Sequence, residues 1–176
     1  MLDHQEILPI IRRFEENELA YSLGGSGMLY YLGLTDAVND WDLIVDCPKN
    51  LLLKAIDGYD WIELESGDYP FASKYRIHIT SLRIDIIGGF AFHTGSELIQ
   101  LPVSHVVNRS WSGIKVSSPE IWYVAYHLMG RVEKSNLILN HLQAYRDIVD
   151  KHLIRNLLRN KGLNPEIREE LSNLVQ

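Results

Sequence analysis

The stretch that decides the fold runs from Leu23 to Asp46 and reads LGGSGMLYYLGLTDAVNDWDLIVD. Asp40 and Asp42 stand near its end, one residue apart, and an apolar run typical of a strand follows them. Alternate side chains of a strand point to the same face, so the two carboxylates should lie side by side. Adjacent carboxylates repel each other unless a proton or a cation lies between them, and Mg²⁺ prefers oxygen ligands. The pair therefore predicts a magnesium site.

A glycine turn, Gly24-Gly25-Ser26, stands at the other end of the same stretch. It follows a short apolar strand at 20–23 and leads into a segment that reads as a helix ending at Gly33. Glycine permits positive φ and a close approach of the backbone, and the N–H groups that open a helix attract phosphate. The serine hydroxyl can add a hydrogen bond to a phosphate oxygen. The turn is therefore predicted to bind an anion beside the metal site.

Asp85 interrupts the otherwise apolar run LRIDII at 82–87. A carboxylate buried among apolar side chains is costly unless it has a partner. If this strand lies beside the strand at 41–46, Asp85 joins Asp40 and Asp42 as a third ligand. Three carboxylates can hold two metal ions, one of which activates an attacking hydroxyl while the other binds the phosphates of a nucleotide.

Length and composition restrict the classes of protein that fit. The 176 residues suffice for one domain with a small helical appendage, and the net charge of −6 disfavours a dedicated nucleic-acid binder. A small or cationic acceptor fits this charge better. The single Cys47 cannot form an internal disulfide, which favours a reducing, cytoplasmic location. An acidic N-terminus argues against a signal peptide, and no apolar run predicts a membrane span.

The order of the expected elements predicts an α/β (α+β) protein with a small mixed sheet flanked by helices. Helices are expected at 4–18, 28–33 and 48–56, and strands at 20–23, 41–46, 59–65, 75–80, 82–87 and 114–116. Residues 90–113 are expected to form loops and one weak strand at 103–107, and their role stays open. A helix should begin at Ser118-Pro119, with helical structure at 121–159 broken around 134–136, and a last helix at 165–174. The predicted division is a catalytic core at 1–117 and a helical C-terminal segment at 118–176.

The motifs at 23–26, 40–43 and 84–86 together resemble those of the DNA polymerase β-like nucleotidyltransferase superfamily. The resemblance covers residues 20–88 and extends more loosely to 113–120, which is similar to the strand and helix start of small bacterial members. Those members include minimal nucleotidyltransferases, antibiotic-modifying adenylyltransferases and toxin-type enzymes of abortive infection systems. The resemblance is therefore carried mainly by the glycine turn and the three aspartates.

The resemblance implies that Asp40 and Asp42 bind both metal ions, Mg²⁺ or Mn²⁺, and the nucleotide phosphates. It implies that Asp85 binds the catalytic metal and is a candidate general base. The implied enzyme transfers a nucleoside monophosphate from an NTP to a hydroxyl by in-line attack on the α-phosphate, with pyrophosphate leaving. Two features depart from the family: Trp41 stands where smaller aliphatic residues are usual, and no basic residue follows the glycine turn closely.

Arg131 and Lys134 are the candidates for the missing phosphate charge, because they follow the helix that approaches the nucleotide in similar proteins. The basic stripe of Lys151, Arg155 and Arg159 is interpreted as a solvated helix face, with a triphosphate or nucleic-acid contact as the alternative.

Two other functions stay open. One is a binding or regulatory module that keeps the fold with little or no catalysis, as one half of a toxin–antitoxin pair. The other is a metal-dependent glycosyltransferase, which also uses Asp-x-Asp, although that interpretation leaves the glycine turn and Asp85 unexplained. The partners expected are an NTP and a small-molecule or protein acceptor, without nucleic acid or membrane, and a homodimer stays open.

Overall fold

The computed structural model describes residues 3–103 and 110–176, and the chain divides into two compact units. The first unit comprises residues up to 66 together with 73–90 and 102–117. The second comprises 67–72, 91–101 and 118–176, so two short segments from the middle of the chain group with the C-terminal helices. The predicted division into a core at 1–117 and a helical segment at 118–176 stays a prediction.

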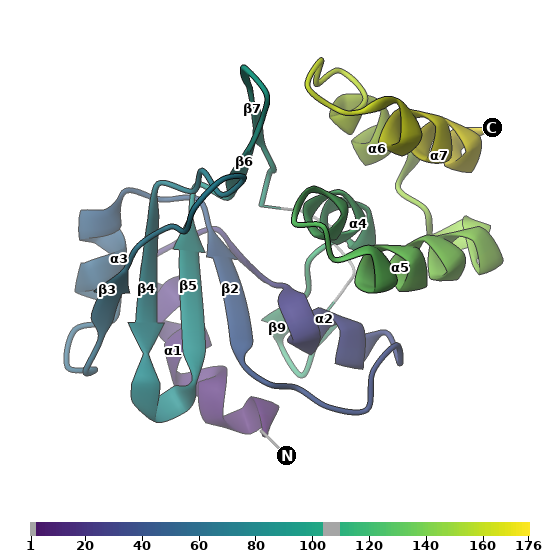
Figure 1. The fold of residues 1–176 in the computed structure, drawn as a ribbon. Coiled ribbons are helices and arrows are strands. Elements are labelled where there is room, and N and C mark those ends of the chain that lie inside the picture. The colour runs from purple at the N-terminus through teal and green to yellow at the C-terminus, as the bar shows by residue number, and fades with distance from the viewer. Residues whose placement is uncertain (1–2, 104–109) are drawn as a thin grey trace. The chain divides into compact units, whose positions relative to one another are not determined.

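The first unit contains a five-stranded mixed sheet (Figure 1). Its strands, in spatial order, are β1 (Tyr21–Leu23), β2 (Trp41–Val45), β5 (Ile84–Gly88), β4 (Tyr75–Ile79) and β3 (Ile62–Leu64). β2 and β5 run parallel, whereas the other neighbouring pairs are antiparallel. A short 3-10 turn, η2 (Thr80–Leu82), links β4 to β5. The predicted fold class, a mixed sheet flanked by helices, is confirmed.

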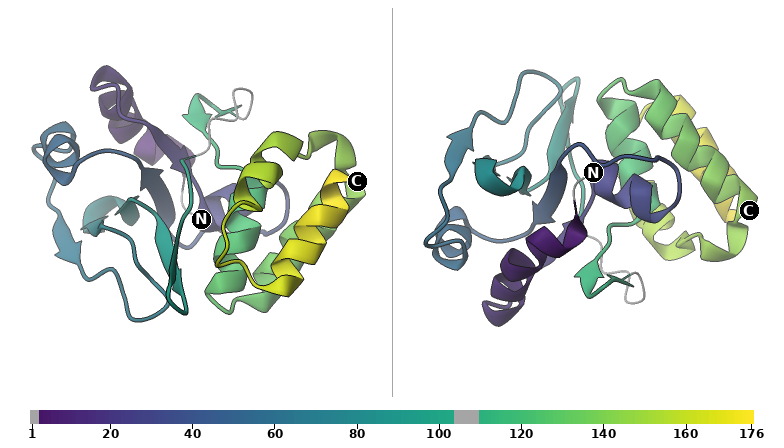
Figure 2. Two further views of the ribbon diagram at one scale, coloured as in Figure 1. Left: turned by 90° about the horizontal axis from the view of Figure 1, so that it is seen from above. Right: turned by 90° about the horizontal axis from the view of Figure 1, so that it is seen from below.

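The two faces of the sheet differ in polarity. α1 (Leu8–Glu16), which follows the 3-10 turn η1 (His4–Ile7), and α3 (Lys49–Ala55) lie on the same side of the sheet (Figure 2). Their apolar side chains share one core with alternate residues of the strands, such as Tyr75, Ile77 and Ile79 of β4. The intervening Arg76 and His78 are only partly buried. The strands therefore present their polar side chains on the face opposite α1 and α3.

α2 (Gly25–Tyr31) follows β1 directly and contacts β2. A short hairpin of β8 (Ser110–Trp111) and β9 (Ile114–Lys115) lies in the same unit, and Leu23 pairs with Val116 just after it. The strand that precedes the glycine turn is therefore paired on both sides, with β2 and with Val116.

The second unit is mainly helical. Its elements are the hairpin β6 (Ala91–Thr94) and β7 (Glu97–Gln100), the helices α4 (Pro119–Leu128), α5 (Val132–Ala144), α6 (Lys151–Leu157) and α7 (Pro165–Val175), and the 3-10 turn η3 (Arg146–Ile148). α4 packs against α5, and α6 packs against α7. Within the described residues, no helix combines the length and hydropathy that crossing a membrane requires.

Two expectations about these elements were wrong or incomplete. The helical break predicted at 134–136 lies inside α5, and the chain turns instead at Gly130, whose positive φ of 71° ends α4. Residues 91–100, expected to be loop, form the β6–β7 hairpin around Gly95 at φ 62°. Most of the weak strand predicted at 103–107 lies outside the described residues.

Candidate functional site

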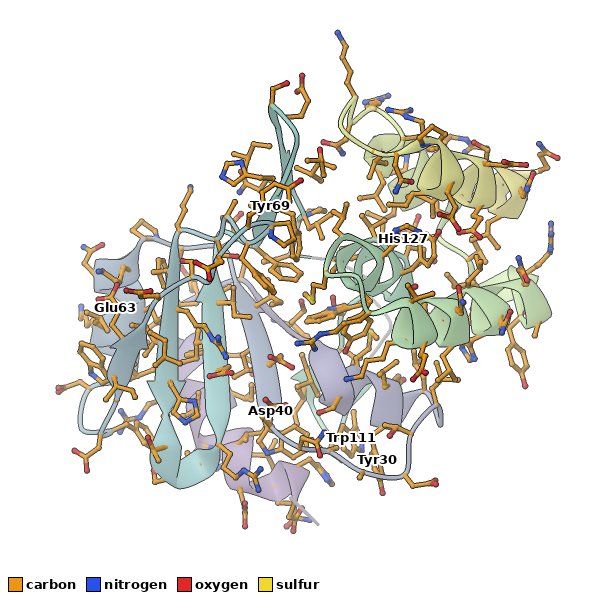
Figure 3. All side chains as sticks on the ribbon, viewed as in Figure 1. Tyr30, Asp40, Glu63, Tyr69, Trp111 and His127 are labelled. Carbon is orange, nitrogen blue, oxygen red and sulfur yellow. The ribbon has the colours of Figure 1, made fainter. Side chains whose placement is uncertain are left out.

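The parallel pairing of β2 with β5 places Asp42 directly opposite Asp85. Asp40 lies two residues before Asp42, at the start of β2 (Figure 3). One carboxylate oxygen from each of Asp40, Asp42 and Asp85 lies within 4.8 Å of the others. The two strands are adjacent, which was the condition for Asp85 to join the pair, and the three aspartates lie on one face of the sheet.

The donor set of this cluster suits a hard divalent cation. Asp85 is 4% exposed, whereas Asp40 and Asp42 are partly buried. Three carboxylates so close together carry a negative charge that needs compensation, and oxygen donors are those that Mg²⁺ and Mn²⁺ prefer. In residues 3–103 and 110–176, no second group of three acidic, histidine or cysteine side chains has this geometry.

Asp85 also has two partners on β4. His78 Nδ1 lies 2.7 Å from Asp85 Oδ1, and Arg76 Nη2 lies 2.5 Å from Asp85 Oδ2. An ionised carboxylate only accepts hydrogen bonds, so His78 Nδ1 is the donor. Neither residue was expected at the site from the sequence. The available signal was the strand YRIHI, whose polar members alternate with apolar ones.

The glycine turn lies against Asp42. Gly24 N donates to the main-chain oxygen of Asp42 at 2.8 Å. Gly25 has φ +54°, and a Cβ built there would lie 1.7 Å from Asp42 Oδ2. Position 25 therefore requires glycine for both its backbone conformation and the space that the Asp42 carboxylate occupies.

Ser26 has a local role that its sequence position did not reveal. Its Oγ donates to the main-chain oxygen of Asp40 at 3.1 Å and accepts from Asn39 N at 3.2 Å. The residue is only 6% exposed. Ser26 thus holds the loop before Asp40 to the start of α2, and its predicted bond to phosphate stays a prediction.

Trp41 points away from the carboxylates. It is fully buried in the core, on the face opposite Asp42. A Cβ at Gly27 would approach its ring to 3.1 Å, so the small residue at position 27 makes room for the indole. The large side chain at position 41 therefore adds no bulk to the aspartate cluster.

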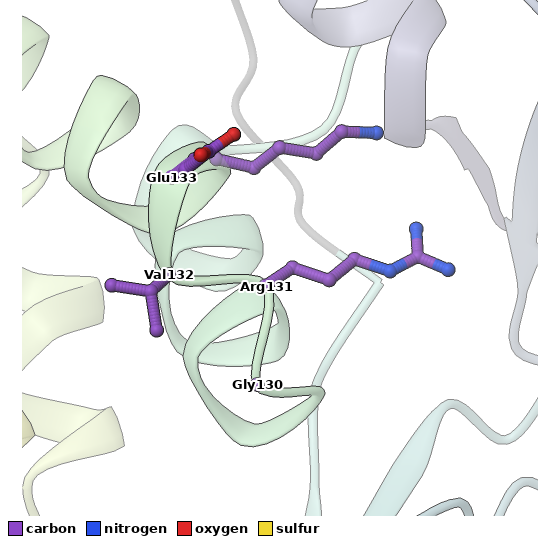
Figure 4. A pocket seen from close by; sticks show the side chains of 5 residues that line it. Gly130, Arg131, Val132 and Glu133 are labelled. Atoms are coloured by element: carbon purple, nitrogen blue, oxygen red, sulfur yellow. The ribbon is translucent and has the colours of Figure 1, made fainter.

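Arg131 and Lys134 belong to the second unit. Both cations lie over the ring of Tyr126, with the Arg131 Cζ 5.9 Å and the Lys134 Nζ 5.3 Å from its centroid. They line a pocket of about 450 Å³, in which Arg131 extends away from Val132 (Figure 4). Two neighbouring cations can attract an anion. Their predicted role toward the nucleotide stays a prediction.

Two ionisable groups at the ends of β2 and β4 have a structural role. Burial raises the pKa of the Tyr75 hydroxyl, which donates to the main-chain oxygen of Cys47 at 2.8 Å. Burial also raises the pKa of the Cys47 thiol. A thiol with a raised pKa is a poor nucleophile, so Cys47 does not suggest covalent catalysis.

No protein-family model matches the sequence, and no curated protein is significantly similar to it. Solved structures with the same fold do exist. The antibiotic-resistance factor ANT(2'')-Ia in solution is similar, with a TM-score of 0.58 and 16% identity, over 97% of this chain and 88% of that one. The crystal structure of ANT(2'')-Ia in complex with adenylyl-2''-tobramycin has a TM-score of 0.55 and 14% identity, over 98% of this chain and 97% of that one. The chain therefore has a nucleotidyltransferase fold, as its motifs predicted.

Proposed function

We propose that the protein is a metal-dependent nucleotidyltransferase that transfers a nucleoside monophosphate from an NTP to a hydroxyl group of a small molecule. The observation that carries the proposal is the meeting of Asp40, Asp42 and Asp85 beside a glycine turn. The likeness in fold to ANT(2'')-Ia supports it.

The three aspartates would hold one or two Mg²⁺ or Mn²⁺ ions. Bound there, the metal would polarise the α-phosphate and lower the pKa of the acceptor hydroxyl. In the proposed reaction the acceptor oxygen forms a bond to the α-phosphorus, and the bond to the pyrophosphate oxygen breaks with its electron pair. Asp85 is the proposed acceptor of the hydroxyl proton. The products are a nucleotidylated acceptor and pyrophosphate.

The triphosphate needs donors and positive charge. The N–H groups of the first turn of a helix have no partner within the helix, so those of Gly25 and Ser26 at the start of α2 are candidates. Gly24 shapes the turn, since its own N–H donates to the main-chain oxygen of Asp42.

Arg131 and Lys134 are the proposed sources of positive charge for the triphosphate. Arg131→Ala and Lys134→Ala should each raise the KM for NTP while leaving the affinity for Mn²⁺ unchanged.

The preferred acceptor is a small, cationic molecule. The complex of ANT(2'')-Ia with adenylyl-2''-tobramycin supports this choice, and the net charge of −6 favours a cation. Amino sugars are therefore the first acceptors to test, with ATP as the first nucleotide. A protein acceptor remains an alternative, and nucleic acid is not expected.

The test is transfer of label from each α-labelled NTP, with Mg²⁺ or Mn²⁺, to a panel of amino sugars, other hydroxyl compounds and proteins. Asp42→Asn and Asp85→Asn should each abolish transfer. Asp46→Asn, which alters an exposed carboxylate just after β2, is the matched control and should retain it. Equal transfer by all four proteins would rule out the aspartate cluster as the active site.

A binding module without catalysis is the second candidate, and the ion pair between Asp85 and Arg76 favours it. Such a protein would bind an NTP without transferring label to any acceptor. The fold argues against the glycosyltransferase alternative. A cytoplasmic location and a homodimer stay predictions.

A further inference from the structure

We infer that Arg76 is a counter-cation of the aspartate cluster, which competes with the metal ion for Asp85 and binds a nucleotide phosphate once the metal takes that carboxylate. The inference rests on the proposed function and assigns to Arg76 a part in it. Arg76 contacts Asp85 from β4, and some of its N–H groups take no part in this contact.

The guanidinium lies on the same carboxylate that the metal would need. Arg76 Nη2 is 2.5 Å from Asp85 Oδ2, and the Asp85 side chain is 5% exposed. The same carboxylate contributes an oxygen to the cluster with Asp40 and Asp42. The guanidinium brings a full positive charge to this carboxylate. Two cations on one buried carboxylate repel each other, and each weakens the binding of the other.

Arg76 has donors that its contact with Asp85 does not use. A guanidinium carries five N–H donors, and a structural pair with a carboxylate is frequently bidentate. Among the described residues, one nitrogen of Arg76 reaches Asp85, and its Nε is buried without a hydrogen-bond partner. The buried Nε cannot meet a ligand, but Nη1 has no hydrogen bond within the described residues and is not buried, so its two N–H groups are open to a phosphate.

Arg76 also supplies a positive charge that the segment around the glycine turn lacks. No lysine or arginine occurs between Gly24 and Ile44, so the segment that carries the glycine turn offers no cation for phosphate. Arg76 comes from β4, and its side chain is 37% exposed. It is therefore accessible to a ligand as well as to Asp85.

His78 orients the Asp85 carboxylate by a hydrogen bond, whereas Arg76 compensates the charge of that carboxylate. The imidazole donates to the other oxygen, Oδ1, and lies opposite Asp85 in the register of β4 and β5. An imidazole N–H can orient a carboxylate without carrying a net charge. Removal of His78 should therefore loosen Asp85 and weaken metal binding, whereas removal of the Arg76 charge should strengthen it.

The first measurement is calorimetric titration of the folded protein with Mn²⁺, without nucleotide. Arg76→Gln and Arg76→Met should each bind Mn²⁺ about tenfold more tightly than the wild type, because a competing cation has been removed. Arg83→Gln is the matched control. Arg83 is exposed, lies two residues before Asp85 and forms no ion pair within the described residues. Its loss should leave the affinity unchanged.

The second measurement is binding of an α,β-methylene ATP analogue at saturating Mn²⁺. Arg76→Gln should bind the analogue several-fold more weakly, since the phosphate has lost a donor, whereas Arg83→Gln should match the wild type. Tighter metal binding together with weaker nucleotide binding is the expected signature. If Arg76 only stabilised the fold, its replacement would weaken the binding of both Mn²⁺ and the analogue.

Four results would count against these ideas. Unchanged or weaker Mn²⁺ binding in both folded Arg76 variants would overturn the competition, and unchanged binding of the analogue would overturn the phosphate contact. If Mn²⁺ binding is lost in Asp42→Asn but insensitive to Arg76, the inference alone fails. If Mn²⁺ binds as well to Asp42→Asn and Asp85→Asn as to the wild type, the proposed metal site fails with it. Circular dichroism establishes folding, and the two Arg76 variants guard against the misfolding of one.

Discussion

The backbone at Gly25 passes so close to Asp42 that the identity of residue 25 controls where that carboxylate can lie. A methyl group there would fall 1.7 Å from Asp42 Oδ2, well inside any permitted contact. The conformation is also left-handed, with φ +54°. Sterics and strain thus act together at one position beside the candidate metal site.

Gly25→Ala is therefore expected to displace the Asp42 carboxylate and to lower the affinity for Mn²⁺ at least about tenfold, as well as destabilising the fold. Gly33→Ala is the matched control, because Gly33 also has positive φ but a methyl group added there would meet no atom of the described residues within 4 Å. It should cost about 1–2 kcal/mol of unfolding free energy from strain alone, with metal binding intact. Equal metal affinity in the two variants would contradict the steric argument.

Tyr21 couples the stability of the first unit to alkaline pH. Burial raises its pKa to about 12 from an ordinary value of 10.0. The folded state therefore holds the phenol proton more tightly than the unfolded state. The contribution to stability is fully present below pH 10 and is lost as the pH rises through about 12.

The unfolding free energy of the wild type should consequently fall more steeply than that of Tyr21→Phe above pH 10. Urea titrations at several pH values between about 9 and 11.5 measure the two slopes. Tyr145→Phe, which removes a hydroxyl from a side chain that is 55% exposed, should follow the wild type. Parallel curves for the wild type and Tyr21→Phe would contradict the expectation.

The turn between α6 and α7 depends on the side chain of Arg168, which lies in α7. The guanidinium of Arg168 donates to three main-chain oxygens, those of Leu163 at 3.1 Å, Leu158 at 2.9 Å and Asn160. These carbonyl groups follow the end of α6, where the main-chain oxygens have no N–H donors within the helix. The rigid fork of arginine can reach three acceptors at once, which lysine cannot.

Arg168→Lys should therefore lower the unfolding free energy by about 1–3 kcal/mol, the cost of leaving partly buried carbonyl groups without donors. Arg155→Lys, at an exposed position on α6, serves as the control and should change stability little. Chemical denaturation measures the loss. Hydrogen exchange of the α6 and α7 amides should accelerate in Arg168→Lys, and unchanged exchange would assign the role elsewhere.

The net charge of −6 acts over the whole molecule and concerns binding rather than fold. If the acceptor is a polycation, its attraction to the protein is screened as the ionic strength rises. The KM for an amino sugar should increase several-fold between about 0.05 and 0.5 M NaCl, while the KM for an uncharged acceptor stays nearly constant. Steady-state transfer assays at several salt concentrations measure this, and equal salt dependence for both acceptors would argue against electrostatic selection.

Local patterns in the sequence were sufficient to identify the main candidate residues of the site. The alternation in Asp40-Trp41-Asp42 placed two carboxylates on one face, and the glycine turn indicated a constrained backbone at Gly25. Asp85 stood out because a charged residue in an apolar strand needs a partner. These features depend on strand periodicity and on the φ angles that glycine permits, both of which are properties of a few neighbouring residues.

Only the tertiary structure decided which segments meet. The sequence left open whether β5 lies beside β2, and it gave no indication that Arg76 and His78 of β4 would contact Asp85. Ser26 likewise showed its contact with Asp40 only in the folded chain. Strand pairing and the side-chain contacts that follow from it join residues far apart in sequence, so they depend on the packing of the whole unit rather than on any local pattern.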